Sequence, residues 1–121
     1  MYRIIKMYKD FLNCVLTDGF KAFCEEKGAY WVFSDVASVL MCGETKKLKG
    51  EDFIILNLKV VEFDNFPNQA EIKLFRDSPF NKENLLYSQD YEYTDLKKGE
   101  YSFYVCKNEL NTFTFMLKEE Y

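Results

Sequence analysis

The sequence predicts an α+β domain in which two or three N-terminal helices pack on one face of a four- to five-stranded antiparallel sheet. Before about residue 50, apolar residues recur at helical spacing, whereas later ones alternate with the two-residue period of strands. Short segments rich in Asn, Asp, Gly and Pro separate the strand-like runs. A chain of 121 residues matches the usual size of one domain, so we expect a single domain over residues 1–121.

The first half predicts the helices. Residues 1–12 fit either a helix or a strand, because their apolar positions satisfy both periods. A clear helix is expected after Thr17, whose hydroxyl can accept a hydrogen bond from a free amide of the first turn. Gly28 predicts its end, since glycine adopts the left-handed conformation that closes helices. A second helix is expected over roughly residues 29–41.

The second half predicts the sheet. Residues 53–63 carry apolar side chains at both alternate sets of positions, which is typical of a central strand. Further strands are expected around residues 70–74, 85–93, 101–105 and 113–117. Because short turns join these runs, we expect an antiparallel meander, with a hairpin loop at residues 97–99.

The charge balance is acidic, with 20 Asp and Glu against 16 Lys and Arg. Nucleic-acid binders need a basic surface to displace counterions, so direct nucleic-acid binding is not expected. The net charge of −4 instead favours a protein partner with a basic surface. The alternative is that this charge only keeps a small domain soluble. A homodimer is compatible with either interpretation.

The reactive residue types argue against catalysis and against a metal site. The chain contains no His, so Ser-His and Cys-His nucleophile pairs are excluded. Its four cysteines form no Cys-x-x-Cys pair, which disfavours zinc, and their irregular spacing disfavours a disulfide framework. We therefore expect no catalytic residues, no metal and no cofactor.

Targeting signals are also not evident. The N-terminal residues offer no continuous apolar segment of the kind found in signal peptides, and no stretch approaches 18 apolar residues. We expect a cytoplasmic protein, of a bacterial cell or a phage-infected host, with no membrane association.

One polar and aromatic cluster stands out in the predicted strand over residues 85–93 and just after it. It comprises Gln89, Tyr91, Tyr93, Thr94 and Asp95, of which all except Thr94 are taken as binding candidates. Gln89 interrupts an otherwise aromatic strand face, and a buried amide must find hydrogen-bond partners. The functional interpretation is a pocket wall for a base, a nucleotide or a peptide. The alternative is an internal network in which the amide and the hydroxyls satisfy each other.

Three residues at the start of the second predicted helix form another candidate. Tyr30 and Trp31 are adjacent, and Asp35 lies one turn after Trp31. A single Trp is most often part of the core, but in an exposed patch it anchors a partner. We therefore treat Tyr30, Trp31 and Asp35 as binding candidates beside the core interpretation.

The order and spacing of several motifs resemble those of an uncharacterised family of small bacterial and phage proteins. The motifs are Thr17-Asp18-Gly19, Ala29-Tyr30-Trp31, the Gln-x-x-x-Tyr-Thr-Asp segment from Gln89 to Asp95, and Glu120-Tyr121. Family members often carry Phe-Pro after that Thr-Asp, where this chain has Leu96-Lys97. The resemblance implies a shared fold and an origin in phage or mobile elements, and it supplies no activity.

These observations favour a non-catalytic interaction protein. By analogy with anti-CRISPR proteins, it would bind and inhibit a host defence or nucleic-acid-processing protein. The alternative is a small-ligand binder of nucleotide type that uses the polar and aromatic cluster. An enzyme that relies on acidic residues is a third hypothesis.

Overall fold

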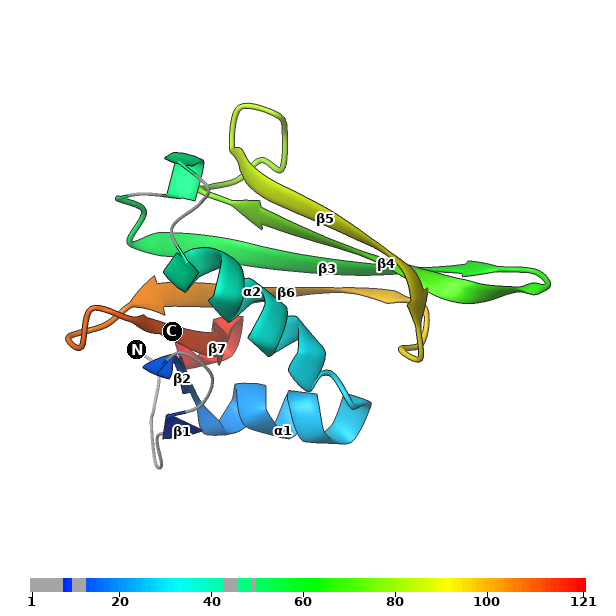
Figure 1. The fold of residues 1–121 in the computed structure, drawn as a ribbon, viewed down its shortest axis with the longest axis horizontal. Helices are drawn as coiled ribbons and strands as arrows, with labels where there is room; N and C mark the ends of the chain where they lie inside the picture. The colour runs from blue at the N-terminus through cyan, green and yellow to red at the C-terminus, as the bar shows by residue number, and fades with distance from the viewer. Residues whose placement is uncertain (1–7, 10–12, 43–45, 49) are drawn as a thin grey trace.

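Two helices lie on one face of a mostly antiparallel sheet in the computed structural model of the chain (Figure 1). The structure describes residues 8–9, 13–42, 46–48 and 50–121. The helices are α1 (Asp18–Lys27) and α2 (Tyr30–Cys42), and two short 3-10 helices are η2 (Lys46–Leu48) and η3 (Lys118–Glu120). The α+β class with helices preceding the main strands is confirmed.

The ends of α1 follow the capping residues in the sequence. The Thr17 hydroxyl accepts a hydrogen bond from the Phe20 amide at 3.3 Å, as an N-cap side chain does. Gly28 takes a left-handed conformation with φ 64°, and its amide donates to the Cys24 carbonyl. Because only two residues separate the helices, α2 turns back directly over the sheet (Figure 1).

The sheet contains more strands than expected. They are β1 (Tyr8–Lys9), β2 (Val15–Leu16), β3 (Phe53–Phe63), β4 (Phe66–Phe75), β5 (Leu85–Thr94), β6 (Gly99–Lys107) and β7 (Phe113–Leu117). The prediction of four to five strands is wrong because β1 and β2 have two residues each, too few to show a period.

The prediction of a purely antiparallel sheet is also wrong. β2 pairs with β7 in parallel, as Val15 lies opposite Thr114 and Leu16 opposite Phe115. Of the ambiguous residues 1–12, the structure settles only Tyr8 and Lys9, which form a strand, and the other residues of that segment lie outside the described part of the chain.

The strands do not form a simple meander. The sheet order is β1-β2-β7-β6-β3-β4-β5, so β6 pairs with β3 rather than with β5. The predicted hairpin loop at residues 97–99 is therefore wrong: residues 97 and 98 belong to a crossover connection, and Gly99 begins β6. Leu96 anchors the connection, since it is buried, its amide donates to Thr94 Oγ1 at 3.1 Å and its carbonyl accepts from Asn68 Nδ2 at 3.0 Å.

The core lies between the helices and the sheet. Aromatic rings from both layers meet there: Phe20 of α1 lies 5.0 Å from Phe103 of β6, and Phe33 of α2 lies 4.8 Å from Phe115 of β7, measured between ring centroids. Such edge-to-face contacts stabilise a core beyond simple burial. The apolar side chains of β3 that share this face, from Ile54 to Val60, are almost fully buried.

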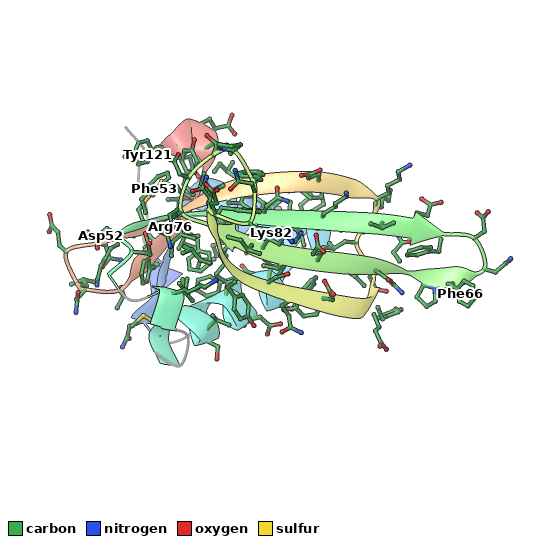
Figure 2. The ribbon with its side chains drawn as sticks, turned by 90° about the horizontal axis from the view of Figure 1, so that it is seen from above. Asp52, Phe53, Phe66, Arg76, Lys82 and Tyr121 are labelled. Carbon is green, nitrogen blue, oxygen red and sulfur yellow. The ribbon has the colours of Figure 1, made fainter. Side chains whose placement is uncertain are left out.

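The opposite face of β3, β4 and β5 is called the outer face here. Both α-helices lie on the other side of these strands (Figure 1). The β3–β4 hairpin projects beyond the rest of the sheet and carries Phe66 at its end (Figure 2), where 71% of this side chain is exposed.

Candidate functional site

A pocket of about 320 Å³ opens between α2 and the C-terminal end of β5. We call it the α2–β5 pocket. The described residues that line it are Gly28, Trp31, Asp35, Tyr91, Tyr93, Thr94, Asp95 and Leu96. Two predicted clusters, distant in the sequence, thus meet at one place.

The wall on the helix side follows from spacing along α2. Trp31 and Asp35 lie four residues apart, so both side chains fall on one helix face. Tyr91 reaches this face from β5. Its ring packs against the Trp31 ring at a centroid distance of 4.8 Å, and its hydroxyl donates to Asp35 Oδ2 at 2.7 Å. One tyrosine therefore fixes the relative position of the helix and the strand.

The other wall comes from the end of β5. The pairing of β4 with β5 shifts between Ala70 and Asn68, where Tyr91 and Thr94 are the respective partners. Thr94 is buried after this irregularity, while 62% of the Tyr93 side chain stays exposed. The Tyr93 hydroxyl donates to Asp95 Oδ1, which holds the ring beside the pocket.

Both tyrosine hydroxyls remain protonated far above neutral pH. Burial raises the pKa of Tyr91, and the hydrogen bond to Asp35 raises it further. The hydrogen bond to Asp95 raises the pKa of Tyr93. Each hydroxyl therefore acts as a donor to a carboxylate at neutral pH, and the pocket presents aromatic faces together with two acidic groups.

Gln89 lies outside this pocket. Its side chain is exposed, so the expectation of a buried amide in the strand face is wrong. Gln89 Oε1 accepts from the Tyr87 hydroxyl at 3.2 Å, and Nε2 donates to the Asp90 carbonyl at 3.1 Å. Gln89 instead lines a neighbouring cavity of about 220 Å³, which shares Asp35 and Tyr91 with the α2–β5 pocket.

Tyr30 does not line either cavity among the described residues. Its hydroxyl donates to Glu25 Oε1 of α1 at 3.3 Å, and its ring packs against the core. Trp31 combines the two interpretations of the sequence, because it packs against the core and also lines the pocket. The expected network between Gln89 and the tyrosines is limited to Tyr87, since Tyr91 and Tyr93 bind carboxylates.

Sequence reasoning missed some lining residues. The sequence pattern assigns Gly28 only the role of a helix end, and it assigns Leu96 no place in the site, although both line the pocket.

A second hollow on the outer face was also missed. This outer groove has a volume of about 280 Å³, and the described residues that line it include Lys59, Val61, Phe63, Glu71, Asp90 and Glu92.

The described residues offer no obvious centre for metal chemistry. Within them, no group of three or more His, Cys, Asp or Glu side chains is placed to hold an ion. Cys14, Cys24 and Cys106 form no disulfide, and burial raises the pKa of Cys106 to about 11. Among the described helices, none combines the length and the apolar character required to cross a membrane.

Comparison with protein families places the chain in a family of unknown function. The model of a family of unknown function, DUF6876, matches residues 2–121, so the chain belongs to this family. The resemblance inferred from the motifs is thereby confirmed at the level of an uncharacterised family. No curated protein and no solved structure matches the chain.

Proposed function

We propose that the chain is a small non-catalytic interaction domain that binds a protein partner through a basic surface of that partner. The main support is the α2–β5 pocket, in which Trp31, Tyr91 and Tyr93 stand beside Asp35 and Asp95. None of the described lining residues carries a positive charge. Aromatic faces and carboxylates both attract the guanidinium of an arginine, so this pocket suits a basic side chain of the partner.

The size and the charge of the chain agree with this proposal. A pocket of about 320 Å³ accepts one or two side chains of a partner. The net charge of −4 over the whole chain attracts a basic surface and speeds the encounter. The chain has no His and therefore cannot form a Ser-His or Cys-His catalytic pair, which agrees with a non-catalytic function.

A more specific form of the proposal concerns the identity of the partner. The phage-type origin implied by the sequence motifs makes a host defence or nucleic-acid-processing protein in the bacterial cytoplasm the first candidate. Such proteins hold nucleic acid in basic channels. An acidic domain that occupies a channel of this kind excludes the nucleic acid and inhibits the protein.

A small base-like ligand is the second candidate function. It is favoured by the Trp31 ring, which is accessible from the pocket and stands edge-on to Tyr91 at an interplanar angle of 61°. Heterocyclic bases stack on such rings. The carboxylates of Asp35 and Asp95 repel phosphate groups, so a nucleoside or a free base fits this pocket better than a nucleotide.

Affinity capture from a bacterial lysate, followed by binding of the purified partner, tests the first function. The test compares the wild-type chain with the double variant Asp35→Asn/Asp95→Asn, which keeps the shape of both side chains. Glu109→Gln, an exposed change in the turn between β6 and β7, is the matched control. We expect the double variant to weaken binding of a basic partner at least about tenfold, and the control to leave it unchanged.

Three results would contradict the first function. They are an equal affinity of the double variant, a captured partner whose contact surface is acidic, and turnover of a substrate by the purified chain. A thermal-shift panel of bases, nucleosides and nucleotides separates the second candidate. A stabilisation that is lost in Trp31→Ala would support a small ligand instead of a protein.

A further inference from the structure

Among the described strands, β5 lies at the end of the sheet order and pairs with β4 alone. The pairing runs without a shift from Tyr87 to Tyr91, opposite Leu74 to Ala70. In an edge strand, every second residue directs its amide and carbonyl away from the neighbouring strand. Residues 88–90 are exposed in succession, which is consistent with a free edge over this regular stretch.

The start of β5 is less accessible. η2 lies against β5, and Figure 1 shows this short helix beside the end at which the strand begins. Leu86 near that end is buried. The accessible part of the edge therefore begins near Tyr87 and continues toward Tyr91.

Both faces of the strand are hollowed next to this edge. The α2–β5 pocket lies on the helix side, the outer groove lies on the other side, and Tyr91 contributes to the lining of both. Successive side chains of a strand point to opposite faces of a sheet. A strand added beside β5 would therefore direct alternate side chains toward the two hollows.

The charges around the edge determine which strand fits. Asp90 and Glu92 line the outer groove, where Glu71 adds a third acidic group and Lys59 a single basic one. Acidic side chains on an edge repel a second copy of the same strand, because like charges then face each other. Together with Asp35 and Asp95 on the helix side, these acidic side chains give the edge a negative potential, which attracts a segment of net positive charge.

The outer groove also has an apolar part. Val61 and Phe63 line it, and their side chains are 37% and 44% exposed. Exposed apolar side chains of this size beside a groove are typical of binding surfaces. The two hollows thus differ in chemistry: the helix side offers aromatic rings and carboxylates, and the outer side offers apolar contact within an acidic rim.

We propose that β5 is the docking edge of this domain, and that an extended basic segment of the partner protein pairs with it as an additional strand. The inference rests on the proposed function and specifies how the partner is held. Arginine side chains of the segment enter the α2–β5 pocket, and the alternate apolar side chains enter the outer groove. Main-chain hydrogen bonds supply affinity and the two hollows supply specificity, as in other strand-addition complexes.

Gln89 lies in the exposed stretch of β5. It donates its side-chain amide to the Asp90 carbonyl at 3.1 Å. Every main-chain carbonyl is a strong hydrogen-bond acceptor, so the Asp90 carbonyl can exchange a side-chain donor for a main-chain donor. On docking, an amide of the bound segment replaces the Gln89 side chain as the partner of the edge.

A synthetic peptide tests the inference directly. The probe has about ten residues that alternate arginine and valine, a length that covers one strand. Two control peptides are needed. One has the same sequence with alternate backbone amides methylated, which removes donors and keeps all side chains, and the other has the same composition with its arginines grouped at one end. Binding is measured by calorimetry, and amide hydrogen exchange locates the bound peptide on the full chain.

We expect the alternating peptide to bind and to slow exchange of the β5 amides between Tyr87 and Tyr91. Methylation or grouping of the arginines should weaken binding at least about tenfold. The double variant Asp90→Lys/Glu92→Lys should also weaken binding, because it replaces the acidic rim beside the strand edge by two positive charges that repel the basic segment. Glu109→Lys, a remote exposed reversal, should not.

The possible failures are distinguishable. If the methylated peptide binds as well as its parent, the side-chain pocket alone is used and the edge inference is overturned, while the proposed function stands. The same conclusion follows if no peptide binds although a basic partner is captured through Asp35 and Asp95. The protein could also form a dimer in which the β5 amides are protected from hydrogen exchange without any peptide. That result would show that a second copy of the chain, and not a basic segment of a partner, occupies the edge.

Discussion

The carboxylate of Glu120 lies 2.7 Å from the point at which a Cβ atom on Gly19 would stand. Glu120 is held there by three hydrogen bonds: it accepts from the Thr17 hydroxyl at 2.6 Å, from the Gly19 amide at 3.0 Å and from the Leu117 amide at 2.8 Å. The acidic group thus satisfies a free amide at the positive end of α1. This contact explains why a glycine directly follows Asp18 in the first turn.

Replacing Gly19 by alanine should therefore destabilise the protein by about 1–3 kcal/mol, because the added methyl group displaces the carboxylate from its hydrogen bonds. In a Glu120→Ala background the same change should become stabilising by up to about 1 kcal/mol, since alanine has the higher helix propensity. Chemical denaturation of the four proteins measures this change of sign. An equal loss in both backgrounds would show that the carboxylate does not set the requirement.

The raised pKa of Tyr91 leads us to expect a loss of stability at alkaline pH. Its pKa is raised in the folded state above the ordinary value of 10.0. Once the pH exceeds that ordinary value, the unfolded chain releases this proton while the folded chain keeps it, so the free energy of unfolding falls as pH rises further. Below that pH the contribution is fully present.

Tyr91→Phe should remove this part of the alkaline slope and cost about 1 kcal/mol near neutral pH, because the hydrogen bond to Asp35 is lost. Unfolding curves recorded between neutral and strongly alkaline pH measure both effects. An unchanged slope in the variant would contradict the assignment.

Phe115 and Phe66 provide a matched pair of phenylalanines. Phe115 is fully buried against Phe20 and Phe33, so Phe115→Ala should destabilise the protein by about 3–5 kcal/mol. Phe66 is 71% exposed at the end of the β3–β4 hairpin, so Phe66→Ala should change stability by no more than about 0.5 kcal/mol. Thermal or chemical unfolding compares them, and a large loss in the second variant would indicate that the hairpin tip packs against something in solution.

We expect Cys14 and Cys106 to be alkylated slowly in the folded protein, because burial raises the pKa of both thiols. Burial raises the pKa of Cys106 from 9.0 to about 11, which lowers its thiolate fraction near neutral pH roughly a hundredfold. Burial also raises the pKa of Cys14, whose side chain is inaccessible. Iodoacetamide followed by peptide mass spectrometry should find both residues unmodified in the native protein and modified after denaturation. Rapid native modification of Cys106 would contradict this.

The sequence predicted the helices well because their ends depend on local chemistry. Thr17 and Gly28 act within one turn of their own positions, and the structure places the ends of α1 beside them. The central position of residues 53–63 was also predictable, since a strand between two others is apolar on both faces.

The sheet order could not be predicted in the same way. β6 could pair with β5 or with β3 without any change in its own alternation, so the partner of β6 cannot be deduced from the pattern of β6 itself. The short strand Val15–Leu16 pairs with β7, which lies about a hundred residues later in the chain, and Tyr8–Lys9 pairs with Val15–Leu16 in turn.

The candidate site shows the same division. Trp31 and Asp35 share a face by helical spacing, which the sequence contains. Their contact with Tyr91 depends on the angle at which α2 crosses the strands of the sheet, and this angle cannot be deduced from the local sequence pattern. Gln89 shares the strand face of Tyr91 but lies opposite Ile72 and away from the pocket, so alternation alone placed it incorrectly in the site.

The position of β3 between β4 and β6 has a consequence for assembly of the native state. β4 follows β3 directly and can pair with it early, whereas pairing of β3 with β6 closes a longer loop and is expected to be slower. Until then, one border of an apolar strand that includes Ile54, Leu56 and Leu58 is unprotected. Partly folded chains are therefore expected to associate through this border, and a chaperone that binds extended apolar segments would find its target there.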